Sequence, residues 1–168
     1  MPPQLTIEKE RRLTSFFFFI YGFGSMAWIP RFPDVKANLG ISNGQFGSMI
    51  SLIALGAIVS FVSVGHLVHR IGAFKSFTVM STLLFSTYIA IVFCNSIAIF
   101  PFLMLFLGFI QSAYHIAANA QAFDTQARAG QLALAGWHGM WSSGAMASAI
   151  VGLFVVGRVS AEVHVTSV

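Results

Sequence analysis

The segment VSFVSVGHLVHRIGAFKSF, from Val59 to Phe77, joins two long apolar runs through a short basic turn. The run that ends in this turn begins at Phe46, and the run that follows it extends to Phe93. A hydrocarbon core of roughly 30 Å needs about 20 mostly apolar residues per helix. The segment therefore predicts two membrane helices that follow each other with almost no connecting loop.

The composition of the whole chain agrees with this interpretation. Of the 168 residues, 57% are hydrophobic and 8% are charged, and the mean hydropathy is +0.81. Such a chain has too few charges to cover a soluble surface. Its apolar runs show no strand alternation, which favours helices over a β-barrel. We predict an all-α polytopic membrane helix bundle, with five transmembrane helices at about residues 13–30, 46–68, 77–93, 97–118 and 140–156.

The remaining segments are too short for a soluble domain. We expect a cytoplasmic N-terminal tail over residues 1–12, a five-helix transmembrane region over 13–157 and a polar C-terminal tail over 158–168. A longer loop is expected from Asn119 to Gly139. The first apolar run is long for a cleavable signal peptide, which indicates a retained span.

The basic residues indicate the orientation. With the N terminus in the cytoplasm, the inside segments hold six lysines and arginines and the outside segments hold three. The positive-inside rule favours this arrangement. The net charge of +4 is scattered over several turns, so we expect the lipid bilayer as a partner and no nucleic acid.

Small residues recur four positions apart in three of the predicted spans. This spacing lets helices approach closely in lipid, so we expect these faces to form helix–helix contacts, with a substrate path as the alternative. The residues are Gly56 and Ser60, Gly108 and Ser112, and Gly144, Ser148 and Gly152.

The basic turn also carries a family pattern. Residues 65–75 are GHLVHRIGAFK, which resembles the loop signature G-x-L-x-D-R-x-G-R-[RK] between the second and third helices of the major facilitator superfamily. Ala73 stands where the family has a basic residue, and the segments 28–35 and 138–144 resemble bacterial members related to the fucose:proton symporter branch. The signature positions here are Gly65, Leu67, Arg70 and Gly72, with Lys75 near the end and His69 in place of the family's Asp.

The resemblance implies a carrier of twelve helices in two halves, with the substrate near the membrane midplane between the halves. It implies transport of a small polar solute, with a sugar-like substrate favoured, in a bacterial inner (plasma) membrane. The resemblance covers five helices, so we expect an incomplete N-terminal half that is inactive without a C-terminal half or another membrane chain. The alternative is a non-transporting membrane protein, either an assembly partner or a decayed remnant.

The fourth predicted span carries three polar side chains one turn apart, Gln111, His115 and Asn119. In a helix this spacing places them on one face. Ionisable residues are costly in the hydrocarbon region and often mark substrate or ion pathways, so the three are candidate substrate-binding residues. Alternatively, His115 and Gln111 only fix helix packing through hydrogen bonds, and Asn119 caps its helix.

Two further candidates lie at the end of the first predicted span. Trp28 precedes Arg31, and Pro30 and Pro33 flank that arginine and are expected to keep the chain extended. Because the first helix lines the cavity in the resembling carriers, Arg31 is a candidate for binding a polar or anionic solute and Trp28 for stacking on a sugar. Alternatively, Arg31 forms an interfacial pair with Asp34, and Trp28 is an ordinary interfacial aromatic residue.

Patterns of other functional classes are weak. Residues 141–144, WSSG, lack the leading glycine of an intramembrane serine protease motif, and no metalloprotease, phosphate-loop or dinucleotide pattern occurs. His66 and His69 lie three apart, but two ligands do not make a metal site. We therefore expect no enzyme, no catalytic residue, no metal site and no cofactor.

Overall fold

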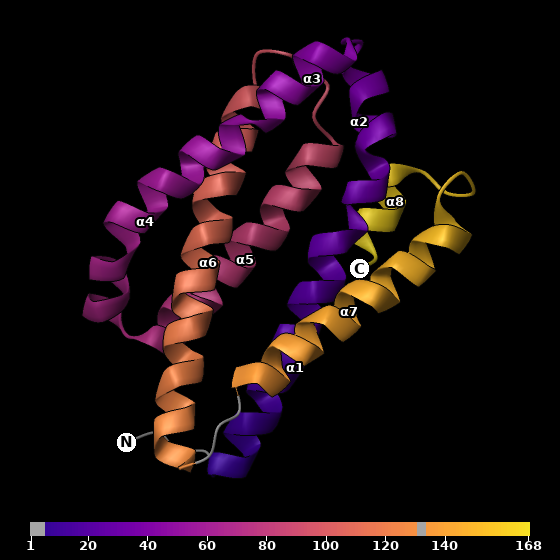
Figure 1. Ribbon diagram of the computed structural model, residues 1–168. Coiled ribbons are helices and arrows are strands. Elements are labelled where there is room, and N and C mark those ends of the chain that lie inside the picture. The colour runs from indigo at the N-terminus through magenta and orange to yellow at the C-terminus, as the bar shows by residue number, and fades with distance from the viewer. Residues whose placement is uncertain (1–5, 131–133) are drawn as a thin grey trace.

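The apolar runs form helices that lie side by side in the computed structural model, which describes residues 6–130 and 134–168 (Figure 1). The described part of the chain is helical apart from short turns, which confirms the all-α fold. Its elements in chain order are α1 (Ile7–Ala27), the 3-10 turn η1 (Ile29–Arg31), α2 (Phe32–Leu39), α3 (Asn43–Ile50), α4 (Leu52–Ile71), α5 (Ala73–Val92), α6 (Phe100–Ala129), α7 (Leu134–Val155) and α8 (Ala161–Thr166).

Within the described residues, four helical stretches are long and apolar enough to cross a membrane, namely Ile7–Leu39, Asn43–Ile71, Ala73–Val92 and Phe100–Ala129. A fifth long helix, α7, has 22 residues and lies where the last span is expected. The chain runs through these helices in alternating directions. The start of α1, the α4–α5 turn and the end of α6 therefore lie towards one end of the bundle, which we call the proximal end. The α2–α3 and α5–α6 connections and the end of α7 lie towards the other, the distal end (Figure 1).

The first membrane helix is interrupted near the distal end. Pro30 and Pro33 lack the backbone N–H that a helix interior requires. They lie in the first turns of η1 and α2, where this group is not needed. The expectation of an extended chain between these prolines is therefore wrong, because the helix restarts after a break at Trp28.

Two pairs of helices cross in backbone contact at the predicted small residues. A Cβ atom built on Gly56 of α4 would lie 1.9 Å from the Leu105 carbonyl oxygen, and one built on Gly108 of α6 would lie 1.9 Å from that of Ile53. Ser60, one turn from Gly56, is fully buried. The prediction that this face packs helices together is confirmed.

A close backbone contact at glycines also joins α1 to α7. A Cβ on Gly144 would lie 2.0 Å from the Phe19 carbonyl oxygen, and one on Gly22 would lie 2.0 Å from the Trp141 carbonyl oxygen. Ser148 is buried one turn further along α7. Neither crossing has room for a larger residue at its glycines.

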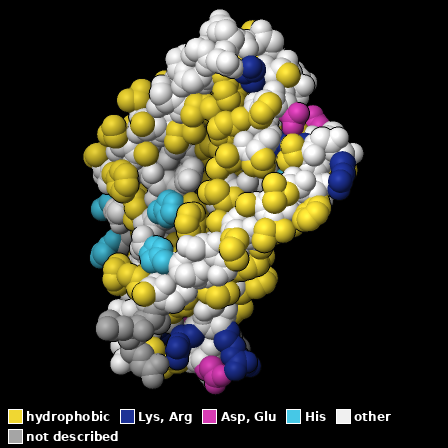
Figure 2. Space-filling view, turned by 45° about the vertical axis from the view of Figure 1, so that its right-hand side comes forward, with side chains coloured by type: hydrophobic (Ala, Val, Ile, Leu, Met, Phe, Trp, Pro, Cys, Tyr) yellow, Lys and Arg dark blue, Asp and Glu magenta, His cyan; other side chains and the backbone are white. Residues whose placement is uncertain are grey.

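The surface of the described chain suits lipid. Figure 2 shows hydrophobic side chains over the middle of the molecule, while the charged side chains gather towards its ends. Phe61, Val62, Phe102 and Leu153 are among the most exposed large hydrophobic residues. In water such a surface would aggregate, whereas in a bilayer it meets acyl chains.

Two segments differ from the sequence expectation. The predicted loop from Asn119 to Gly139 is wrong, because α6 continues to Ala129 and α7 begins at Leu134. Asn119 consequently lies inside α6 and does not cap it. The expected polar tail contains α8, whose residues Ala161, His164 and Val165 are buried, and α8 packs against α5 and α1.

Candidate functional site

A cavity of about 120 Å³ lies between α1, α6 and α7. It is formed near the middle of α1 and α6, roughly where the centre of a bilayer would fall. Its lining combines aromatic faces with uncharged polar groups. The lining residues are Phe18, Tyr21, Tyr114, His115, Ala118, Asn119, His138 and Trp141.

A hydrogen-bonded pair forms the centre of this cavity. The Tyr21 hydroxyl group and His115 Nε2 lie 2.7 Å apart, so α1 and α6 are joined there by a side-chain hydrogen bond. Tyr21 is 3% exposed, and its ring packs against Tyr114 with ring centroids 4.2 Å apart. The packing holds the phenol in place, so the His115 ring is fixed in orientation.

The helical spacing of α6 explains how its three predicted residues lie. His115 and Asn119, four positions apart, both line the cavity. Gln111 lies one turn before His115 on α6 and interacts through its side chain with the Tyr21 hydroxyl group. The structure thus brings these three candidates together on the face of α6 that meets α1.

Helix α7 adds two residues that the sequence analysis did not include in the candidate site. His138 and Trp141 lie on one face of α7 because they are three positions apart, and both line the cavity. The His138 ring packs edge-on against Phe18 with centroids 5.7 Å apart. The Trp141 indole N–H is buried and has no hydrogen-bond partner among the described residues.

The charge of the cavity wall restricts what it can bind. No Asp, Glu, Lys or Arg of the described chain lines this cavity. The polar groups of its lining residues are two phenols, an amide, an indole N–H and two imidazoles, which are hydrogen-bonding groups without a fixed charge. Such a wall is chemically suited to an uncharged polar molecule.

The other two sequence candidates lie away from this cavity, at the distal end. Trp28 is buried and packs on Phe32 and Tyr88, with ring centroids 4.7 and 5.7 Å apart. Arg31 is 1% exposed and donates to Asp34 Oδ2 at 3.3 Å and to the Val159 carbonyl oxygen at 3.1 Å. The structure therefore does not bring Trp28 and Arg31 together with His115.

The signature residues form the turn between α4 and α5. Gly72 has a φ angle of +87°, a backbone conformation that favours glycine, and its N–H group donates to the Val68 carbonyl oxygen. Gly72 is the C-terminal cap of α4, and its conformation lets α5 begin at the next residue, Ala73. The signature residues Gly65, Leu67, His69, Arg70 and Lys75 are exposed on the last turns of α4 and the first turn of α5.

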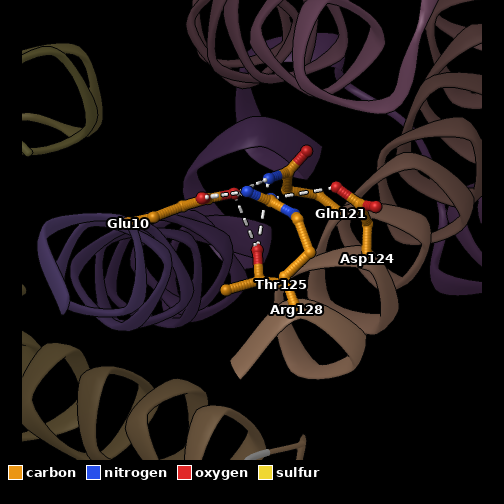
Figure 3. A network of polar contacts seen from close by, with 5 residues as sticks. All are labelled: Glu10, Gln121, Asp124, Thr125 and Arg128. Atoms are coloured by element: carbon orange, nitrogen blue, oxygen red, sulfur yellow. Dashed lines mark hydrogen bonds and ion pairs between the residues drawn. The ribbon is translucent and has the colours of Figure 1, made fainter. Parts of the chain in front are cut away.

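A polar network at the proximal end ties α1 to α6 (Figure 3). Glu10 of α1 accepts hydrogen bonds from Gln121 Nε2 at 2.9 Å, from Thr125 Oγ1 at 3.0 Å and from Arg128 Nη1 at 2.8 Å. Arg128 also pairs with Asp124 at 3.0 Å. The sequence analysis missed this network because Glu10 and Arg128 are 118 positions apart, and no local spacing reveals such a pair.

Comparison with known proteins identifies the family. The family model for the Major Facilitator Superfamily matches residues 14–164. The chain belongs to the Major Facilitator Superfamily. It is similar to an uncharacterized MFS-type transporter of Yersinia pestis, with 26% identity over 147 residues, or 88% of this chain and 38% of the relative. It is also similar to the uncharacterized transporter y4wD of Sinorhizobium fredii, with 25% identity over 74% of this chain and 33% of the relative. A third relative is the membrane protein MosC of Rhizobium meliloti, with 27% identity over 79% of this chain and 33% of the relative.

This superfamily membership confirms the family-level resemblance and an integral membrane location. Superfamily proteins are transporters and not enzymes. The chain spans about a third of the length of the relatives it matches. No solved structure matches it.

The two glycine crossings fit the repeats of this superfamily. If the first three spans and the next spans form two related units, exchanging the units replaces α1 by α6 and α4 by α7. The α1–α7 crossing at Gly22 and Gly144 then corresponds to the α4–α6 crossing at Gly56 and Gly108. Both crossings therefore join one unit to the other, and exchanging the units converts one crossing into the other.

Proposed function

We propose that this chain forms the first five spans of a carrier that moves a small, uncharged polar solute across the membrane by alternating access. The observation that carries this proposal is the central cavity, which is lined by the Tyr21–His115 pair, Asn119 and Trp141 and by no Asp, Glu, Lys or Arg of the described chain. Superfamily membership and the relationship to MFS-type transporters support it.

A sugar-like solute suits the cavity chemistry best. Hydroxyl groups of a sugar can both donate and accept, which matches imidazole, amide and phenol groups. The less polar faces of a sugar ring pack well on aromatic rings such as those of Tyr114 and Trp141. We assign the central binding role to His115, Gln111 and Asn119, with Tyr21 holding His115 in place. Arg31 and Trp28, held at the distal end, are in our proposal supporting residues and do not contact the solute.

We also propose that a second set of helices completes the binding site. Carriers of this superfamily bind substrate between two halves, and the chain spans only 33–38% of its relatives. The His115 and His138 side chains are exposed in the isolated chain, as expected for one wall of a larger site. This chain alone should therefore bind a solute weakly and should not transport it.

The proposed orientation has the N terminus in the cytoplasm of a bacterium and the chain in the inner (plasma) membrane. The basic residues of the tail and of the signature turn then face the cytoplasm. In this orientation Gly65, Leu67, Arg70, Gly72 and Lys75 form the cytoplasmic loop between the second and third spans. His69 replaces the acidic residue of the superfamily signature there, so this loop lacks the fixed negative charge that the signature places at that position.

Binding to the purified chain in lipid nanodiscs tests the solute class. Trp141 lines the cavity, so a bound solute should change tryptophan fluorescence in a saturable way. The probes are neutral monosaccharides, with sugar acids and a quaternary amine as charged comparators. We expect binding of a neutral sugar, a loss of about tenfold in affinity for His115→Ala from the loss of about one hydrogen bond, and no loss for Trp28→Phe.

Two outcomes would contradict the proposal. Equal or tighter binding of the charged comparators would show that the cavity wall does not select for uncharged solutes. Uptake of a neutral sugar into proteoliposomes that contain only this chain would show that no second half is needed.

A further inference from the structure

A buried arginine connects three elements at the distal end of the bundle. Arg31 lies in the break between α1 and α2, and its guanidinium group reaches the end of α7. It donates to the Val159 carbonyl oxygen at 3.1 Å, lies 3.5 Å from that of Val155, and pairs with Asp34 at 3.3 Å. Positive charge at the C-terminal end of a helix is favourable, so Arg31 stabilises the end of α7.

The remaining donor of Arg31 contacts α8. Arg31 Nε donates a hydrogen bond to Nδ1 of His164 at 2.9 Å. His164 is 2% exposed, and its Nε2 atom has no partner among the described residues. Because Nδ1 accepts from a group that can only donate, this contact requires a neutral ring with its proton on Nε2.

We propose that Arg31 and His164 form a pH-sensitive latch that holds α8 against the distal end of the bundle at neutral pH and releases it on acidification. Burial lowers the pKa of His164, and the positive charge of Arg31 lowers it further. A proton on Nδ1 would remove the acceptor and place a second positive charge against Arg31. The docked form therefore excludes the proton that an exposed histidine would accept.

The sign of the pH effect follows from the lower pKa of His164 when α8 is docked than when α8 is free. The ordinary pKa of histidine is about 6.5. Above this value His164 is neutral whether α8 is docked or free, so pH has no effect on docking. Below it only the free form binds the proton readily, so docking weakens as the pH falls.

The charges around His164 set the strength of the effect. Arg31 is the only charged side chain in the described chain with a hydrogen bond to the His164 ring. Asp34 of α2 offsets part of the Arg31 charge, but its side chain is 46% exposed. Glu162 lies on α8 itself, is half-buried, and has its pKa lowered in part by the charge of Arg31. The residues of α5 that line a cavity with α8 are Phe85, Tyr88 and Ile89. None of these side chains is charged at neutral or mildly acidic pH.

The latch acts on α8 and leaves the rest of the bundle in place. When α8 leaves, Arg31 keeps its contacts with Val159 and Asp34, so the end of α7 remains tied to the first span. The buried residues Ala161 and Val165 become exposed. Release of α8 would thus open the groove between α1 and α5 at this end.

Thiol accessibility within α8 tests the latch in the full chain in nanodiscs. The background is Cys94→Ala, which removes the free cysteine. Val165→Cys places a thiol on the buried face of α8, and Val163→Cys, at a position that is 56% exposed, places one on the open face. The ratio of their maleimide labelling rates cancels the effect of pH on thiol ionisation.

We expect this ratio to rise as the pH falls from about 8 to about 5, by at most about 30-fold, because pH 5 lies about 1.5 pH units below the ordinary pKa of histidine of about 6.5. In a His164→Gln background the ratio should be independent of pH, while His69→Gln and Glu162→Gln should keep the rise. A constant ratio in the native sequence, or a rise that persists in His164→Gln, would overturn the proposal.

Nuclear magnetic resonance of ¹⁵N-labelled histidine gives a second measurement that needs no change near α8. The His164 ring should remain neutral, with an unprotonated Nδ1, below a pH of about 6.5, the ordinary pKa of histidine. Protonation of His164 at or above this ordinary value would equally overturn the latch.

Discussion

Substitution of Gly144 by alanine tests the backbone contact between α1 and α7. The new Cβ atom would lie 2.0 Å from the Phe19 carbonyl oxygen, about 1 Å inside the 3.0 Å limit for such contacts. The same Cβ atom would also lie 2.9 Å from the Phe23 amide nitrogen, so it cannot move away from the carbonyl oxygen towards that atom. Both obstacles are backbone atoms, so no side-chain rotation relieves the clash and the two helices must separate.

The expected cost follows from these distances. Overpacking typically costs about 1–3 kcal/mol, and a backbone clash should lie near the upper end. Alanine gains about 1 kcal/mol over glycine in a helix. The net loss of unfolding free energy for Gly144→Ala is therefore about 2 kcal/mol.

A matched control lies on the same helix. A Cβ on Gly139 would meet no atom within 4 Å, so Gly139→Ala should stabilise the chain by about 1 kcal/mol from helix propensity alone. Equilibrium unfolding of both variants in detergent, titrated with dodecyl sulfate and followed by circular dichroism, measures the difference. If the two variants change the unfolding free energy equally, the glycine contact does not determine how α1 packs on α7.

Two further predictions concern the contacts between α1 and α6. Tyr21→Phe removes the hydrogen bond to His115 while keeping the ring, so the unfolding free energy should fall by about 1 kcal/mol and sugar binding should weaken about threefold to tenfold. Unchanged binding in the fluorescence assay would exclude a positioning role for Tyr21. Glu10→Gln breaks the ion pair with the 45% exposed Arg128, and solvent screening limits the loss of unfolding free energy to about 1 kcal/mol, which added salt should reduce. The control is Glu8→Gln, because the Glu8 side chain is 72% exposed and pairs with Arg12 on the surface of α1. This control should change the unfolding free energy little. An equal loss in both variants would show that the Glu10 network does not stabilise the α1–α6 contact.

Hydropathy and small-residue spacing were sufficient to predict the bundle and the packing faces of α4, α6 and α7, but not which helices cross. Gly56, Gly108 and Gly144 each lie at a helix contact because a helix repeats its face every three to four residues. The same reasoning located His115 and Asn119 on one face. These predictions succeed because they depend only on residues close together in the sequence.

Other features depend on contacts that sequence spacing does not encode. The loop predicted after Asn119 was wrong because hydropathy reports the apolar part of a helix, whereas α6 continues through alanine-rich polar residues that favour helix. Arg31 and His164 are 133 positions apart, so only the fold brings them together. The cavity likewise needs three helices at once, which explains why His138 and Trp141 were missed.

The contacts of α1 indicate how this half would move in a carrier. At the proximal end Glu10 ties α1 to α6, and at the distal end Arg31 ties the first span to α7. Between them the Gly22 and Gly144 contact fixes the crossing with α7, and Tyr21 fixes the contact with α6. A helix held at both ends and in the middle is poorly suited to bending during transport. For the carrier that we propose, rigid-body rocking of this chain against a second set of helices therefore agrees better with these contacts than a change of shape within the chain.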